Sequence, residues 1–190
     1  MASAAMMPNI EYSLAERAVR SEGLLSASAL PDVLARPSVI AATIEPVPPR
    51  LQKVTLRKRG SEIFVVVQAS GQLPGPFLKS LETIAALLTL APNWNSYSAK
   101  PIDPRNAVCA IRLVWDLLQP GIAPPLVVPR VRGGIQLEWH TENGDIEIYI
   151  DSPDQITFFA EHTESGESTE EPLAGHQEVL KAWVQRISGK

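Results

Sequence analysis

The stretch GGIQLEWHTENGDIEIYI, residues 133–150, decides the fold. Apolar and polar residues alternate on both sides of the tetrapeptide TENG. A period of two places one apolar and one polar face on a β-strand, and Asn-Gly favours a tight turn whose twist suits antiparallel strands. The stretch therefore predicts a β-hairpin with one buried face and one polar face.

The position of the turn determines which residues lie opposite each other. We expect Asn143 and Gly144 to be the two turn residues, because this choice keeps every charged side chain off the apolar face. The expected cross-strand pairs are Trp139–Ile148 and Leu137–Ile150 on the apolar face, and His140–Glu147 and Glu138–Tyr149 on the polar face.

Further strands are expected on both sides of the hairpin. ITFFAEH follows the turn DSPDQ, and pairing Ile150 with Ile156 places Phe158 beside Ile148 on the apolar face. LVVPR, at 126–130, predicts a preceding strand whose proline marks an edge or a bulge. The segment HTESGESTEEP, at 162–172, predicts an acidic loop without core residues.

Helices are indicated by apolar residues that recur on one face. Three helices are expected. The start of the second is predicted by Asp103 as its N-cap and by Pro104 at its first helical position. The expected buried stripes are Phe77, Leu81, Ile84 and Leu88, then Val108, Ile111, Trp115 and Leu118, and finally Leu180, Trp183, Val184 and Ile187. With two strands around RKRG, the pattern predicts an α+β fold, an antiparallel sheet with helices packed on one face.

The chain divides by composition at about residue 50. Residues 1–50 are rich in Ala, Ser and Pro and predict a flexible, largely irregular arm, with one helical piece at Ser13–Arg20. Residues 51–190 are expected to form a single α+β domain.

Bulk properties narrow the function classes. The 190 residues carry a formal net charge of −4, which gives no global attraction to nucleic acid or to anionic membranes. Cys109 is the single cysteine and lies inside an expected helix, so a buried structural thiol is favoured over a nucleophile. With neither a secretory signal nor a membrane-spanning stretch, we expect a cytoplasmic protein, and no metal or cofactor motif is evident.

The polar face of the hairpin is the first candidate site. A histidine oriented by a carboxylate is the minimum set of groups for acid–base catalysis, and His140 beside Glu147 supplies it, with Glu138 and Tyr149 nearby. The ordinary interpretation of the same pair is an exposed ion pair. Tyr149 and Phe159 fall on the same face of neighbouring strands and form a patch suited to a protein partner, unless the N-terminal hairpin or the arm covers it.

A basic run is the second candidate. The run contains no acidic residue and consists of Lys53, Arg57, Lys58 and Arg59. Its positive charges are suited to contacts with the phosphates of a nucleic acid. The alternatives are a solvated turn, or attraction to the acidic segment 162–172 within the fold or between subunits.

The connector APNWNSYSAKPIDP, residues 91–104, is the third candidate. Trp94 and Tyr97 lie among small polar residues between two helices. They can form a ligand site, or they can seal the end of the core with their polar tips outward. We favour the second interpretation, which predicts that Trp94 packs against Trp139 or Trp115.

Two patterns then suggest a family. The first pattern precedes the second helix and consists of Trp94, Asn95, Tyr97, Ala99 and Pro101. The second pattern opens the hairpin and consists of Gly133, Gly134, Ile135, Leu137 and Trp139. In this order, W-D/N-x-Y-x-A/G and G-G-I/V/L-x-L-x-W resemble a widespread uncharacterised family of small bacterial proteins, over roughly residues 78–160. The resemblance implies the fold and a bacterial origin, and it brings no activity. Members often have Asp at position 95 and Gly at positions 96 and 98. Because this chain has Asn95, the resemblance disfavours an acid catalyst at that position.

Together these observations predict a non-catalytic protein-interaction or regulatory module, for example an antitoxin-like or defence-associated accessory subunit. The expected partner is another protein. Nucleic-acid binding through the basic run and a small acid–base enzyme at His140 and Glu147 remain the alternatives.

Overall fold

The computed structural model describes residues 10–14, 50–59 and 62–188. Three helices and eight strands occur in this part of the chain. In order they are β1 (Ile10–Leu14), β2 (Arg50–Arg59), β3 (Glu62–Ser70), α1 (Gly75–Leu87), α2 (Pro104–Leu117), β4 (Leu126–Pro129), β5 (Ile135–Thr141), β6 (Gly144–Ser152), β7 (Gln155–His162), β8 (Ser168–Pro172) and α3 (Gln177–Ser188).

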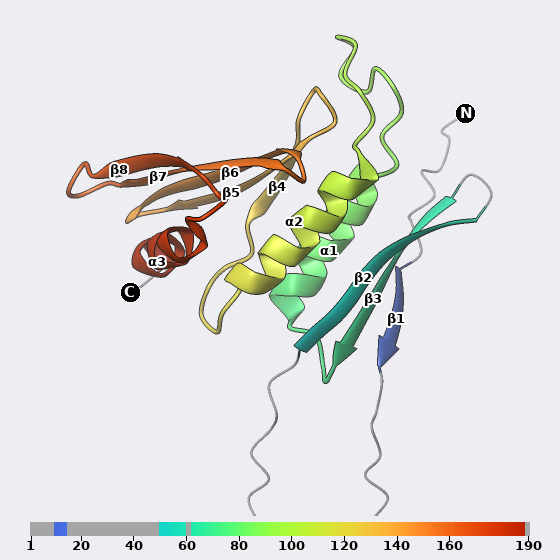
Figure 1. Ribbon diagram of the computed structural model, residues 1–190, viewed down its shortest axis with the longest axis horizontal. Helices are drawn as coiled ribbons and strands as arrows, with labels where there is room; N and C mark the ends of the chain where they lie inside the picture. Colours follow the sequence, from blue (N-terminus) through green and yellow to red (C-terminus); the bar gives the residue numbers. More distant parts are fainter. Residues whose placement is uncertain (1–9, 15–49, 60–61, 189–190) are drawn as a thin grey trace, which may run out of the picture.

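The strands form two sheets rather than the single sheet expected. A three-stranded sheet has the order β1-β3-β2, and a five-stranded antiparallel sheet has the order β4-β5-β6-β7-β8. The helix pair α1 and α2 lies between them, and α2 contacts β2 on one side and β5 and β6 on the other (Figure 1). The α+β class is confirmed, and the helix pair keeps the 50–70 hairpin away from the later strands.

Helix α2 begins as the sequence predicts. The Asp103 side chain accepts a hydrogen bond from the Arg105 backbone N–H at 2.8 Å, and Pro104 is the first helical residue. The buried stripe differs, because a helix between two sheets is buried on two sides. Its buried residues are Asn106, Ala107, Ala110, Ile111, Val114 and Leu117, whereas the predicted Val108, Trp115 and Leu118 are half-buried. The stripes of α1, except half-buried Leu88, and of α3 are confirmed.

The hairpin has the predicted faces but a different register. Leu137 pairs with Ile148 and Trp139 with Ile146, so every predicted pair is shifted by two residues. Thr141 pairs with Gly144, and the turn residues are therefore Glu142 and Asn143. The predicted pairs His140–Glu147 and Glu138–Tyr149 are wrong, and the observed pairs are His140–Asp145, Glu138–Glu147 and Gln136–Tyr149.

Gly144 explains the shift. It belongs to the first position of β6, and a Cβ there would lie 2.0 Å from the carbonyl oxygen of Glu161 on β7. The glycine is thus required by a close approach of two strands instead of by the turn. The Thr141 hydroxyl stabilises the turn by accepting from the backbone N–H groups of Asn143 and Gly144, each at 3.2 Å.

The outer strands are partly as predicted. Ile150 pairs with Ile156 and Ile148 with Phe158, as expected. Residues 168–172, predicted as part of a loop, form the edge strand β8, which pairs Glu171 with Phe158. Backbone hydrogen bonding holds β8, so no apolar alternation reveals it.

The N-terminal region contributes one strand. β1 pairs in parallel with β3, with Ile10 opposite Val65 and Leu14 opposite Ala69. The predicted helix at Ser13–Arg20 is therefore wrong at Ser13 and Leu14, and its remainder lies outside the described residues.

Candidate interaction surface

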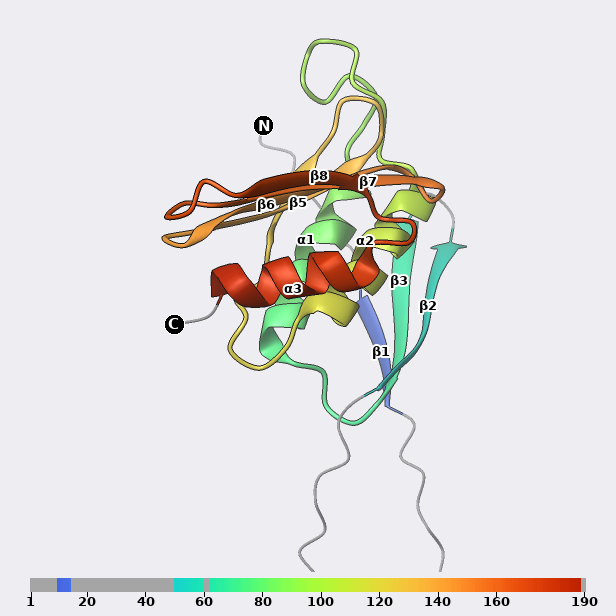
Figure 2. The same cartoon turned by 60° about the vertical axis from the view of Figure 1, so that its left-hand side comes forward.

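One face of the five-stranded sheet is left without a helix. α1, α2 and α3 all lie on the inner side of this sheet (Figures 1 and 2), where Ile135, Ile148 and Phe158 are fully buried. We call the opposite side the outer face. By register and alternating burial it carries Gln136, Glu138 and His140 on β5, Asp145, Glu147 and Tyr149 on β6, Thr157, Phe159 and Glu161 on β7, and Glu170 on β8.

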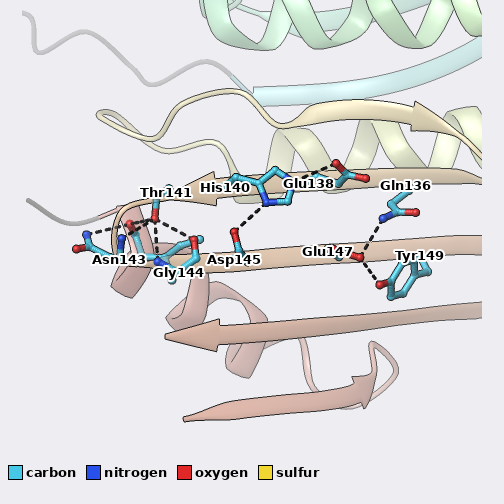
Figure 3. Close-up of polar contacts among 10 residues, drawn as sticks. Gln136, Glu138, His140, Thr141, Asn143, Gly144, Asp145, Glu147 and Tyr149 are labelled. Atoms are coloured by element: carbon cyan, nitrogen blue, oxygen red, sulfur yellow. Dashed lines mark hydrogen bonds and ion pairs between the residues drawn. The ribbon is translucent and has the colours of Figure 1, made fainter. Parts of the chain in front are cut away.

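His140 lies between two carboxylates on this face (Figure 3). Its Nδ1 is 2.8 Å from Asp145 Oδ1, and its Nε2 is 3.1 Å from Glu138 Oε2. Only the imidazolium form can donate to both carboxylates at once. Hydrogen bonds to Asp145 and then to Glu138 accordingly raise the pKa of His140 above its ordinary value of 6.5.

A second cluster lies beside the first. Glu147 accepts hydrogen bonds from Gln136 Nε2 at 3.0 Å and from the Tyr149 hydroxyl (Figure 3). Burial, followed by the hydrogen bond to Glu147, raises the pKa of Tyr149 to about 12. The Arg130 guanidinium lies 4.8 Å from the centre of the Tyr149 ring and 3.4 Å from Asp151 Oδ1. Tyr149 is thus fixed at both its ring and its hydroxyl.

The apolar part of the outer face is small. Tyr149 and Phe159 are half-buried on neighbouring strands, and Leu126 on β4 is 58% exposed. Phe159 lies opposite Glu147 on one side and Glu170 on the other. The face therefore has aromatic rings at its centre with carboxylates around them, an arrangement suited to a protein partner.

Trp94 and Tyr97 lie on a projecting structure. The connector 91–103 runs beside the turn 130–134, and two backbone hydrogen bonds join them: Lys100 N–H to Val131 O at 2.8 Å, and Asp103 N–H to Gly133 O at 2.9 Å. We call these two segments the double loop. It rises on the outer side of the five-stranded sheet, at the end where β5 begins (Figures 1 and 2).

The double loop is held by its own polar groups. Asn93 Oδ1 accepts from the Ser98 N–H at 2.7 Å, and Asn95 Oδ1 accepts from the Tyr97 and Ala99 N–H groups at 2.8 and 3.1 Å. Asn93, Ser96 and Ser98 have positive φ angles of 63°, 64° and 66°. Such angles are unfavourable for residues with a Cβ, so these side-chain bonds offset local strain.

The predicted aromatic plug is wrong for Tyr97 and unsupported for Trp94. Tyr97 is 87% exposed, and half-buried Trp94 donates its indole N–H to Lys100 O at 3.0 Å within the loop. Trp115 instead packs edge-on against Phe77, with ring centres 5.0 Å apart. Because the connector projects from the fold, its aromatics do not reach the core.

Glycines and one buried amide attach the double loop to the fold. A Cβ at Gly133 would lie 2.7 Å from Pro101 O, and one at Gly134 would lie 2.6 Å from Ile150 O. Asn106, at 2% exposure, donates its side-chain amide to Gly133 O at 3.0 Å and to Asp151 O at 3.2 Å. Asn106 was not predicted as a structural residue, although an asparagine in the first turns of an otherwise apolar helix face is a usable signal.

The basic run lies on the other sheet. Lys53 and Arg57 are exposed on β2. Lys58 and Arg59 continue this strand, and their side chains lie outside the described structure. These residues are separated from the outer face by the helix pair, so the two candidate surfaces are distinct (Figure 1).

Other chemistry finds little support in the described residues. Burial raises the pKa of the Cys109 thiol, which disfavours a nucleophile. Within residues 10–14, 50–59 and 62–188, no group of three His, Cys, Asp or Glu side chains is arranged to hold a metal ion. An apolar cavity of about 530 Å³ lies between Pro74, Phe77, Trp115 and Ile122, away from the outer face. No helix in this part of the chain is long and apolar enough to span a membrane.

Comparisons with known proteins give no relative. No protein-family model, no curated protein sequence and no solved structure matches the chain. Only the site itself therefore bears on the function.

Proposed function

We propose that the protein is a non-catalytic protein-interaction module of a regulatory or accessory kind, and that its outer face is the binding surface. The observation that supports this most is the position of the helices. All three pack on the inner side of the five-stranded sheet, which leaves two aromatic rings and a ring of carboxylates uncovered by the described elements.

The polar groups of the outer face favour binding over catalysis. Both ring nitrogens of His140 are engaged by carboxylates, and Glu147 is engaged by Tyr149 and Gln136. A general base needs a free lone pair directed at a substrate proton. Satisfied groups, in contrast, are suited to burial in an interface, because they lose few hydrogen bonds to water.

The experiment removes the centre of the surface. The double variant Tyr149→Ser/Phe159→Ser and the matched control Lys53→Ser/Arg57→Ser on β2 are each used in affinity purification from the source cells, with chemical crosslinking. We expect the wild type and the control to retain a stoichiometric protein partner, either another protein or a second copy, crosslinked to β5–β8. The outer-face variant is expected to lose it.

Two outcomes contradict the proposal. The first is a wild-type protein that is monomeric and carries no crosslink on the outer face. The second is a partner that the β2 control loses and the outer-face variant keeps. If nuclease treatment also releases that partner, the basic run is a nucleic-acid contact instead.

A further inference from the structure

We propose that the partner of the outer face is a second copy of this chain, bound in a two-fold symmetric dimer. In this dimer the double loop of each copy lies over the far end of the other copy's sheet. The inference rests on the proposed function, since it requires the outer face to be a binding surface.

The charges of the surface are separated along the strands. At the end where β5 begins, the double loop carries Lys100 and Arg132, both exposed. No carboxylate in the described part of the chain forms an ion pair with either, whereas neighbouring Arg105 and Arg130 are paired with Asp103 and Asp151. This end of the surface therefore has unpaired positive charge.

The opposite end is acidic. The turn between β5 and β6 carries Glu142, the last residues of β7 include Glu161, and the turn that follows carries Glu164. All three side chains are exposed, and no cation among the described residues pairs with them. We call the end with these three residues the acidic end.

This separation makes the surface complementary to its own copy in one two-fold arrangement. Two-fold symmetry turns one copy by half a revolution. If a residue of the first copy contacts a different residue of the second copy, the same two positions also meet with the copies exchanged. If the two-fold axis lies in the interface at right angles to the strands, an outer face laid on a second outer face brings each basic double loop to the other copy's acidic end. A surface of uniform charge would repel its own copy.

The shape and the centre of the surface agree with the charges. The double loop rises above one end of the outer face in both views (Figures 1 and 2), so two copies can enclose the sheets between two such projections. Phe159 lies midway along its strand and comes close to the axis. Glu138, whose side chain is 15% exposed, and Glu147 also lie there, but each already accepts hydrogen bonds from its own copy.

The size of the surface sets the expected affinity. A face of five strands by seven residues measures about 20 Å by about 23 Å, or roughly 450 Å² per copy. Stable specific interfaces bury about 800 Å² per partner. The sheets alone are therefore too small, and the double loops must supply the remainder. We expect a weak dimer, with a Kd on the order of 10 µM and strongly dependent on salt.

Analytical ultracentrifugation of purified protein tests the dimer by charge exchange. One variant reverses the double loop, Lys100→Glu/Arg132→Glu, and another reverses the acidic end, Glu142→Lys/Glu161→Lys. Each alone is expected to dimerise at least about tenfold more weakly than the wild type at about 50 mM salt. Their mixture is expected to recover the dimer, because both contacts of the heterodimer are then between opposite charges. Lys53→Glu/Arg57→Glu is the control and is expected to dimerise like the wild type.

The outcomes separate the two proposals. A wild type that stays monomeric up to about 200 µM, or a mixture that does not recover the dimer, overturns the two-fold dimer. If the outer face is nevertheless crosslinked to a different protein in cells, the proposed function stands without the dimer. Growth into larger species with rising concentration also overturns it, since a closed two-fold interface stops at two copies.

Discussion

Asn106 shows how a single buried side chain can connect three segments. It belongs to α2, and its amide donates to the backbone of the double loop at Gly133 and to the end of β6 at Asp151. Its Oδ1 accepts no hydrogen bond from the described residues, so only the donor half of the amide holds these contacts. The residue therefore links α2 to both the double loop and the end of β6.

Replacing Asn106 with Ala is expected to lower the free energy of unfolding by about 2–3 kcal/mol, because it removes two hydrogen bonds made by a buried side chain and opens a small cavity. Urea unfolding followed by circular dichroism measures the change. Arg112→Ala, an exposed position on the same helix, is the control and is expected to change stability by less than about 0.5 kcal/mol. An equally small effect at Asn106 would show that its two hydrogen bonds are dispensable.

Tyr149 gives a pH-dependent prediction. Burial and the hydrogen bond to Glu147 raise the pKa of this phenol from 10.0 to about 12. Because the folded-state pKa is raised, the associated stability is fully present below pH 10 and is lost as the pH rises towards 12. A spectrophotometric titration of tyrosinate, as the difference between wild type and Tyr149→Phe, is expected to show this transition. Glu147→Gln is expected to move it to lower pH, and an unmoved transition would remove Glu147 as a cause.

At the scale of elements, the hairpin shows what alternation can and cannot predict. A period of two assigns each residue to a face, and a register shift of two leaves that assignment unchanged. The apolar face was therefore predictable, and so was the outer-face position of Glu138, His140 and Tyr149. The partners of His140 were not, because they depend on whether Gly144 serves the turn or the strand.

The double loop carries the prediction at this scale. Ser98 has a φ of 66°, a conformation that is unfavourable by about 1–2 kcal/mol for a residue with a Cβ. Ser98→Gly relieves this strain, and the greater freedom of glycine in the unfolded chain offsets about half of the gain. We expect unfolding to become less favourable by about 0.5–1 kcal/mol, measured by urea titration.

Asn93→Gly is the matched comparison for Ser98→Gly. It also relieves a positive φ, of 63°, but it removes the oxygen that accepts from the Ser98 N–H. Asn93→Gly is therefore expected to destabilise the protein. If both variants change stability in the same direction, the side-chain hydrogen bond at Asn93 contributes less than backbone strain.

At the scale of the whole molecule, α2 is the shared element of two sheets. Its fully buried residues include the small Ala107 and Ala110, which permit both sheets to approach the helix closely. The sequence predicted the helices and the individual strands, but strand alternation does not say which strands are neighbours. The division into two sheets and the adjacency of Lys100 and Arg132 both arise from how α1 and α2 are placed, which no local pattern records.

Enlarging a side chain of α2 is therefore expected to disturb both sheets at once. Ala110→Leu adds volume to a filled core and is expected to cost about 1–3 kcal/mol. Amide hydrogen exchange is expected to show protection falling together in β2 and β6, the strands that α2 contacts in the two sheets. Arg112→Leu, at an exposed position of the same helix, controls for the added side chain. Loss of protection in only one sheet would show that the two sheets unfold separately.

The alternation of β5 to β8 also has a consequence for the divergence of related sequences. The inward residues of these strands form the core, whereas the residues that alternate with them lie on the outer face. Substitutions at the outward positions can accumulate with little change in folding. Descendants of this chain can thus acquire different binding preferences while they keep the same interior, and a sequence comparison would find the two sets of positions changing at different rates.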